Sequence, residues 1–406
     1  MKKHFNFSNN LFIKSLRLLL IFTVFMGTNS SVVLGATTDL EISGWIPYWK
    51  VKEGVADARK HLEDLDQIHP FVFSVKEDGT LNDLGNIKKS PWTRLIREAK
   101  KEKVRVIPTV MWSNTENIHR ILSNPNLRKN HVEAIASMVK KGKYDGVDID
   151  YEGKKAETKD YYSMFLTELK KAIGSKMLVC TIEARTPAAS LYTTIPTTLQ
   201  YANDYAVIGS VCDRIQLMTY DQQRADLQLN AARMGSPYIP VGDVDWVRKV
   251  AELAITLLPK EKIVLGVATY GREWAVQVSP DWYRSYVQVG AINHTDAVKK
   301  AKDLKIDIMR NSAGEASFTY IQDPATQKLL KNIKIPKNTP KSDEAAAKAL
   351  AYANQTGNTV FFNIVWWSDA KAIKQKIDLA EKLGLRGIAI FKIDGGEDPL
   401  IWDMIK

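Results

Sequence analysis

Eight short apolar segments recur along the chain, each five to eight residues long. They are nearly continuous in Val, Ile, Leu and aromatic residues instead of alternating with polar ones, which is typical of strands buried on both faces. Such strands belong to parallel sheets that are covered by helices. We therefore predict eight strands, at residues 42–49, 71–75, 104–111, 146–151, 177–183, 214–219, 263–269 and 387–393.

Helical spacing of apolar residues appears between several of these segments. The clearest case runs from Asp369 to Leu383, where Ser368 or Asp369 can cap the start and Gly384 can end the helix. Because strands alternate with helices, we predict an α/β fold, a closed (β/α)8 TIM barrel. The same helical spacing is seen at Trp92, Ile96 and Ala99 and at Tyr162, Phe165 and Leu169.

The length of the chain requires one insertion in the barrel. A barrel of this kind takes about 250 residues, whereas the chain has 406. Most of the excess lies after the seventh strand, at about residues 275–365, with strand-like pieces at 318–321 and 360–365. We expect a small α+β insertion between strand seven and helix seven. A separate domain is less favoured, because no linker-like tract flanks this segment.

The N-terminus has the pattern of a signal peptide. Lys2, Lys3, Lys14 and Arg17 precede an apolar run at 18–26, and small residues follow up to Ala36. The run is shorter than the roughly 20 apolar residues that cross a bilayer, which disfavours a retained anchor. We expect residues 1–36 to be removed and the mature protein, 37–406, to be secreted or associated with the cell wall, with no stable membrane anchor.

The charge balance changes once this leader is excluded. The formal net charge of the whole chain is +11, and it falls to +7 without the four basic residues of the leader. The composition is otherwise that of a globular protein, with 45% hydrophobic and 25% charged residues. No motif found below is a basic patch, so we do not expect nucleic acid as a partner. We expect a monomer.

The cysteines and histidines give no sign of a metal site. Cys180 and Cys212 either pair once or are two free buried thiols, and we favour free thiols because each lies beside an apolar, strand-like run. The six His residues are scattered, without an HxxH or HExxH pattern. We therefore expect no metal and no cofactor.

Acidic residues interrupt the fourth predicted strand in a regular way. Asp148, Asp150 and Glu152 lie two residues apart, so their side chains face one side of the strand. Burying three carboxyl groups together requires protonation, partners or a function. An exposed edge strand is the alternative, but Val147 and Ile149 would then be left half-buried. The carboxyl end of a barrel strand is where active sites lie, so we predict a catalytic site here.

At this point the sequence resembles glycoside hydrolase family 18, whose DxxDxDxE signature is matched at Asp145, Asp148, Asp150 and Glu152. The resemblance extends over nearly all of the mature chain, and the insertion after strand seven resembles that of many family members. Further matching segments are GWIPYW at 44–49, MTYD at 218–221, GVATYGREW at 266–274, WWSDA at 366–370 and GGEDP at 395–399.

The resemblance implies a mechanism in which the substrate takes part. Glu152 is implied to be the acid and then the base, while the acetamido group of the sugar attacks the anomeric carbon, so that configuration is retained. Asp150 is implied to bind the acetamido N–H, with Asp148 behind it sharing a proton. Tyr220 is implied to donate to the acetyl oxygen. Asp145, Met218 and Asp221 complete the pocket that the resemblance implies.

Aromatic and basic residues at strand ends are candidates for binding the sugar rings. Two features depart from the family pattern. Phe391 stands where many members have a Trp as the floor of the catalytic subsite, and the third strand lacks the SxGG of many chitinases. The second departure favours glucosaminidases of the bacterial cell wall or cortex over true chitinases. The candidates for binding are Trp45, Tyr48, Trp49, Trp112, Tyr270, Arg272, Trp274 and Phe391.

The resemblance thus implies a hydrolase of polymers that contain β-linked N-acetylglucosamine: chitin, chitooligosaccharides or peptidoglycan. An endoglycosidase acting on N-glycans would use the same motif. A lectin on the same barrel, which binds chitin or another carbohydrate without cleaving it, is the alternative from another class. Lectins of this family usually lose the acid, whereas Glu152 is present.

Overall fold

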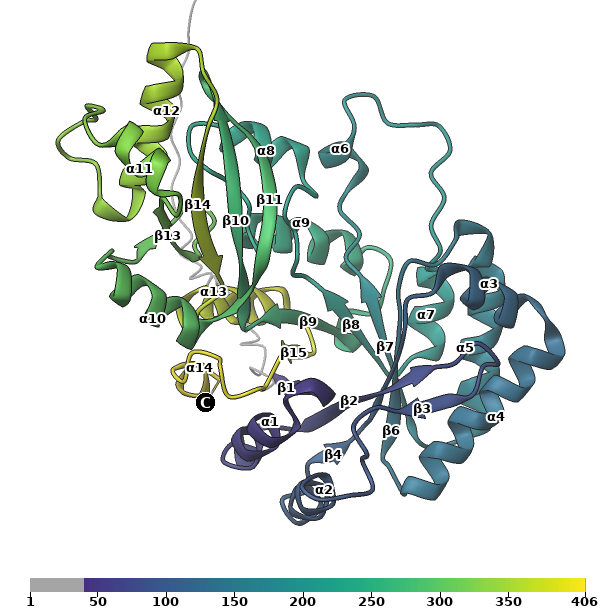
Figure 1. Cartoon of the computed structure of the whole chain (residues 1–406). Helices are drawn as coiled ribbons and strands as arrows, with labels where there is room; N and C mark the ends of the chain where they lie inside the picture. The colour runs from purple at the N-terminus through teal and green to yellow at the C-terminus, as the bar shows by residue number, and fades with distance from the viewer. Residues whose placement is uncertain (1–39, 406) are drawn as a thin grey trace, which may run out of the picture. The chain divides into compact units, whose positions relative to one another are not determined.

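The computed structural model describes residues 40–405, so the predicted signal peptide lies outside the described residues. Eight parallel strands close into a barrel, because β1 pairs with both β15 and β2. This confirms the predicted α/β barrel (Figure 1). The barrel strands are β1 (Glu41–Pro47), β2 (Gln67–Val75), β4 (Arg105–Val106) with β5 (Thr109–Trp112), β6 (Gly146–Tyr151), β7 (Met177–Glu183), β8 (Arg214–Met218), β9 (Ile263–Ala268) and β15 (Gly387–Phe391).

The third barrel strand is interrupted at Ile107 and Pro108, between β4 and β5. Pro108 has no backbone N–H to give to a neighbouring strand, which accounts for the break. The interruption lets β5 continue beside β6, with Thr109 in register with Asp148. A short strand, β3 (Leu81–Asp83), pairs antiparallel with the last residues of β2, Phe73 to Val75, and forms a hairpin with it.

Helices surround the barrel, as Figure 1 shows. The predicted helix before the last strand is α13 (Ala370–Leu383), with the Asp369 side chain capping its start and Gly384 in the left-handed region at its end. The other helices of the barrel layer and its loops are α1 (Val51–Ala58), α2 (Trp92–Lys101), α3 (Thr115–Ser123), α4 (Pro125–Gly142), α5 (Lys159–Ile173), α6 (Ala188–Leu191), α7 (Tyr205–Val211), α8 (Leu227–Ala232), α9 (Val244–Ile255) and α14 (Ile401–Met404).

The insertion is built around an antiparallel sheet of five strands, in the order β11-β10-β14-β13-β12. It begins at Tyr270 and ends at Trp367, so it is slightly wider than the range expected from the sequence. Because β10 follows β9 almost directly, the sheet rises from the carboxyl end of the barrel. Its elements are β10 (Tyr270–Ser279), β11 (Trp282–Asn293), α10 (His294–Leu304), β12 (Met309–Arg310), β13 (Ala316–Tyr320), α11 (Pro324–Leu330), α12 (Glu344–Thr356) and β14 (Val360–Trp367).

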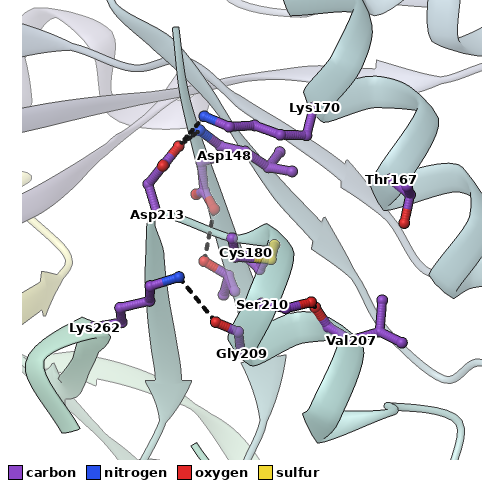
Figure 2. Close-up of a disulfide and its surroundings, with 12 residues drawn as sticks. Asp148, Thr167, Lys170, Cys180, Val207, Gly209, Ser210, Asp213 and Lys262 are labelled. Carbon is purple, nitrogen blue, oxygen red and sulfur yellow. Dashed lines mark hydrogen bonds and ion pairs between the residues drawn. A yellow bond between two sulfur atoms is a disulfide. The ribbon is translucent and has the colours of Figure 1, made fainter. Parts of the chain in front are cut away.

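Cys180 and Cys212 form a disulfide, with their Cα atoms 6.1 Å apart. The prediction of two free thiols is therefore wrong. Cys180 lies on β7 between residues that face the barrel interior, so its own side chain faces the helix layer, while Cys212 directly follows α7, just before β8. Figure 2 shows the bond linking strand to helix, with the Lys170–Asp213 ion pair beside it.

No helix within residues 40–405 is both long and apolar enough to cross a membrane.

Candidate active site

Asp148 lies fully buried inside the barrel and accepts three hydrogen bonds from side chains of three other barrel strands. Trp45 Nε1 and the Thr109 hydroxyl donate to its Oδ2 over 2.9 and 2.7 Å, and the Thr181 hydroxyl donates to its Oδ1 over 2.7 Å. Burial raises the pKa of Asp148 to about 6 against these three donors, which lower it. The donors hold the carboxyl group in one orientation.

A second layer of polar groups lies below Asp148 in the barrel. Oε1 of Gln216 lies 3.1 Å from the Thr181 hydroxyl oxygen, and Nε2 of Gln216 lies 3.2 Å from Nε2 of His69. Burial lowers the pKa of His69 to about 3, so its ring is neutral at ordinary pH. A neutral His69 adds no positive charge below the carboxyl groups, and the site keeps its acidic character.

Asp150 is the next carboxyl group along β6, and it is buried with an open acceptor. Its Oδ1 has no hydrogen-bond partner among residues 40–405. Burial, together with the nearby carboxyl groups of Glu152 and Asp148, raises the pKa of Asp150 well above its usual range. A buried oxygen without a donor is costly to the folded protein, which is the pattern of a group that binds a ligand.

Glu152 follows β6 directly and is accessible from the carboxyl end of the barrel. Its backbone N–H donates to Trp112 O over 2.8 Å, so the strand pairing extends one residue beyond β6. Burial of the carboxyl group and the charge of Glu183 raise the pKa of Glu152. A raised pKa suits a group that has to donate a proton near neutral pH.

Asp145 does not belong to this site, although the sequence placed it there. It precedes β6, so it lies at the opposite, amino-terminal end of the barrel. Its Oδ2 accepts from the backbone N–H of Val106 over 2.9 Å. Asp145 lies three residues before Asp148 in the signature. Because β6 begins only at Gly146, this spacing leaves Asp145 at the start of the strand while Asp148 lies inside the barrel. The contact ties β4 to the start of β6.

Four residues predicted for the site do come together where the insertion begins. Asp221 accepts from the Tyr270 hydroxyl over 2.8 Å and from Nη2 of Arg272 over 2.8 Å. Asp221 has a φ of 53°, in the left-handed region, so the turn after β8 points its carboxylate at β10. Tyr220 is half-buried, and burial and the hydroxyl of Tyr270 raise its pKa well above the usual range.

An aromatic floor surrounds Phe391 at the end of β15. Its ring stacks on Tyr220, with centroids 5.5 Å apart and planes at 12°. The rings of Trp45, Phe71 and Tyr270 meet the same ring edge-on, with centroids 5.7 to 6.1 Å away. Phe391 is therefore at the centre of this aromatic cluster and is supported on several sides.

Tyr48 and Trp49 lie at the mouth of the site. Tyr48 and Glu152 line one hollow of about 480 Å3, together with Met111 and Phe71. Trp49 is 47% exposed, and its ring meets Phe71 edge-on at 5.8 Å. Both tyrosine and tryptophan are accessible enough to contact a sugar.

Two predicted aromatic contacts point mostly elsewhere. Trp112 borders the hollow that Tyr48 and Glu152 line, but its buried ring packs on Tyr151 and His131, with centroids 5.3 and 5.5 Å away. Trp274 is buried in the core of the insertion. Met218 is half-buried at the end of β8, in register with Glu183.

Sequence reasoning missed Thr109, Thr181, Phe71 and Met111. Met111 is in register with Asp150 and contacts the aromatic floor, whereas its neighbour Trp112 does not. The signal was available in the alternation of strand side chains, because Thr109 and Met111 share one face of β5. Trp112, which alternates to the other face, was predicted because it is an aromatic residue at a strand end.

Residues 42–396 match the sequence pattern of the family described as Glycosyl hydrolases family 18. The chain belongs to this family. Its carboxyl groups on β6, the barrel and the insertion sheet agree with the resemblance noted from the motifs. The fold is thus that of a family 18 glycosidase.

This family 18 chain is similar to several described proteins and to several proteins of known structure. It is 25% identical over 295 residues to the "Putative sporulation-specific glycosylase YdhD" of Bacillus subtilis, covering 72% of this chain but only 57% of that protein. It is 22% identical to the "Cortical fragment-lytic enzyme" of Bacillus subtilis, covering 86% of this chain and 69% of that one. The crystal structure of a chitinase from Chromobacterium violaceum matches with a TM-score of 0.64 at 15% identity, over 90% of this chain and 98% of that chain, and shows the same fold.

Proposed function

We propose that this protein is a secreted, retaining glycosidase that hydrolyses β-linkages of N-acetylglucosamine in bacterial peptidoglycan. The observation that carries the proposal is the open acceptor of Asp150, buried within the same group of carboxyls as Glu152. An acetamido N–H is a donor of the kind that this oxygen lacks. Glu152 follows Asp150 on the same side of the strand. If Asp150 binds the acetamido group of a sugar, the carboxyl group of Glu152 can reach the glycosidic oxygen of that same sugar.

The proposed reaction has two steps. In the first, the Glu152 carboxyl group gives its proton to the glycosidic oxygen, the bond from that oxygen to the anomeric carbon breaks, and the acetamido oxygen bonds to the same carbon. In the second, a water gives a proton to the Glu152 carboxylate and attacks the anomeric carbon, which reopens the oxazolinium ring. Two inversions at one carbon leave its configuration retained.

The other residues of the site bind and orient the sugar in this proposal. Asp150 accepts the acetamido N–H and stabilises the positive charge that develops on the ring, and Asp148 holds Asp150 from below. Tyr220 donates its hydroxyl to the acetyl oxygen. Phe391 packs against the apolar face of the sugar, as aromatic rings do.

Peptidoglycan is favoured over chitin for two reasons. The third strand reads Thr109-Val-Met-Trp112 and lacks the SxGG of many chitinases. The relatives that cover most of this chain include proteins named for lysis of cortical fragments. Secretion is supported by the leader-like N-terminus and by the disulfide, since disulfides persist in oxidising compartments.

The test compares the wild type with Glu152→Gln on purified peptidoglycan, chitooligosaccharides and a high-mannose glycopeptide. We expect the wild type to release reducing ends from peptidoglycan and Glu152→Gln to lose at least a hundredfold in rate. Glu157→Gln, an exposed change five residues along the chain, is the control and should keep full activity. Preferential cleavage of chitooligosaccharide or of the glycopeptide would replace peptidoglycan as the substrate. Binding without cleavage of any of the three would identify a lectin.

A thiazoline analogue of the oxazolinium ion tests the participation of the substrate. We expect it to inhibit competitively, because it resembles the intermediate in shape and charge. Full activity in the presence of saturating thiazoline would contradict this mechanism.

A further inference from the structure

An ion pair between a buried lysine and a half-buried glutamate stands directly beside the predicted acid. The Lys154 side chain has no exposed surface, and its ammonium group lies 3.3 Å from Oε2 of Glu183. The same ammonium donates to Tyr151 O and lies 4.9 Å from the centre of the Tyr162 ring. Lys154 is only two residues after Glu152, so its charge is held close to the carboxyl groups of the site.

Glu183 has further contacts that fix the backbone after Glu152. Its Oε1 accepts from the N–H of Gly153 over 2.8 Å, and its Oε2 accepts from Nδ2 of Asn203 over 2.9 Å. Gly153 has a φ of 64°, in the left-handed region that favours glycine. The Thr115 hydroxyl donates to Gly153 O over 2.7 Å, so the turn is held at both its N–H and its carbonyl.

Glu183 is ionised despite its position. Burial would raise the pKa of Glu183, but the Lys154 ammonium and the donors from Asn203 and Gly153 outweigh it, and the pKa is lowered. Glu183 therefore brings a full negative charge that offsets Lys154. Without it, a buried cation would stand uncompensated near Asp150 and Glu152.

The titratable groups around Glu152 come from three elements and their adjoining turns. Glu183 and Asp221 raise its pKa, while Lys154 lowers it. The pKa values of Asp150 and Tyr220 are raised by Glu152 in turn. These groups are Asp150 on β6, Lys154 in the turn that follows, Glu183 at the end of β7, and Tyr220 and Asp221 after β8.

We propose that Glu183 is a positioning residue for Glu152, because it holds the turn at Gly153 and neutralises the Lys154 ammonium. The proposal rests on the role of Glu152 as acid in the proposed function. Glu183 lies outside the DxxDxDxE signature and the MTYD segment, at the end of the neighbouring strand β7. Glu183 and Lys154 act as a pair. The Lys154 ammonium holds the turn through its hydrogen bond to Tyr151 O. The Glu183 carboxylate offsets the positive charge of Lys154, which would otherwise stabilise the ionised form of Glu152.

The pair predicts opposite effects for its two members. Glu183→Gln keeps an oxygen for the Gly153 N–H but leaves the Lys154 cation unbalanced, so the pKa of Glu152 should fall. Lys154→Met removes the cation and leaves Glu183, so the pKa of Glu152 should rise. The double variant removes both charges and should return close to the wild type. A merely structural role would lower activity without moving the pH profile in opposite directions.

The experiment measures kcat/KM on peptidoglycan against pH for the four proteins. The alkaline limb reports the loss of the proton from Glu152. We expect it to move to lower pH by about one unit in Glu183→Gln and to higher pH by about one unit in Lys154→Met. Glu168→Gln, which removes the charge of an ion pair with Arg128 on the outer helices, is the matched control and should leave the limb unchanged.

A second readout does not depend on activity. Carbon-13 labelling of glutamate side chains gives the titration of the Glu152 carboxyl by NMR, assigned with Glu152→Gln. A wild type that cleaves nothing would overturn the proposed function, while the NMR titrations would still decide the role of Glu183. If Glu183→Gln does not fold, Lys154→Met carries the same test. Unshifted titrations, or shifts of the same sign in both single variants, would overturn the proposal.

Discussion

The Thr109 hydroxyl donates a 2.7 Å hydrogen bond to Oδ2 of Asp148, so a side chain of the third barrel strand helps to hold the buried carboxyl group of the fourth. The absence of SxGG from this strand therefore does not leave Asp148 without a hydroxyl donor from β5. Thr181 provides a second hydroxyl from β7 on the other side.

Replacing Thr109 with Val tests this contact, because the shape is kept and the donor is lost. We expect the free energy of unfolding to fall by about 1–3 kcal/mol, since a buried carboxyl group loses one of its donors. Urea denaturation gives the value. Thr109→Ser should restore most of it, and Thr167→Val on the outer face of α5 should cost far less. A stability of Thr109→Val equal to the wild type would show that the contact contributes little.

The strands and helices could be predicted because their signals are local. The run at 146–151 and the cap and end of the helix at 369–384 depend on neighbouring residues alone, and the structure has them at those positions. The carboxyl group that is farthest from the site, Asp145, was misplaced because a motif gives spacing along the chain but not which end of a strand a residue occupies. The direction of the Trp112 ring could not be predicted for a similar reason, since a shift of one residue on β5 changes which face a side chain takes.

The disulfide could not be predicted for a different reason. Cys180 and Cys212 are 32 residues apart, and their pairing depends on how α7 packs on β7. The ion pair of Lys154 with Glu183 is also nonlocal, because it joins the turn after β6 to the end of β7. Such contacts follow from the closed barrel, which places neighbouring strand ends together, and not from any pattern in either segment.

Removing the disulfide should lower stability substantially. Closing a loop of this length stabilises a protein by about 4 kcal/mol in the chain-entropy description. We expect the Cys180→Ala/Cys212→Ala variant to unfold at a clearly lower temperature, measured by circular dichroism. Dithiothreitol should lower the Tm of the wild type and leave that of the double variant unchanged. An equal response of both proteins to dithiothreitol would speak against the bond.

Phe391 should matter for binding more than an exposed phenylalanine does. Phe391→Ala removes the ring at the centre of the floor, and contacts of such rings contribute about 0.5–1.5 kcal/mol each. We expect kcat/KM on the cleaved polymer to fall about tenfold, mainly through KM. Phe361→Ala, at a ring on β14 that is 48% exposed, is the control. A comparable loss in both variants, or none in Phe391→Ala, would remove Phe391 from the substrate floor.

Glu397 should make the protein less stable as the pH rises. It is buried in the loop after β15, and burial, with the neighbouring Asp57 carboxyl, raises the pKa of Glu397 to about 9. The unfolded chain has the ordinary value of about 4.3. Between these two values the folded protein holds a proton that the unfolded chain has released, so the stabilisation is complete below about pH 4 and is lost as the pH approaches 9.

The measurement is the free energy of unfolding between pH 5 and 9, for the wild type and for Glu397→Gln. The amide cannot ionise, so the variant should gain on the wild type by up to about 1.4 kcal/mol for each pH unit. Glu98→Gln is the matched control: hydrogen bonds from Arg59 and Arg94 lower the pKa of Glu98 to about 2, so both its folded and unfolded values lie below this range. Its removal should therefore leave the slope unchanged. Parallel pH profiles for the wild type and Glu397→Gln would mean that Glu397 ionises normally in the folded protein.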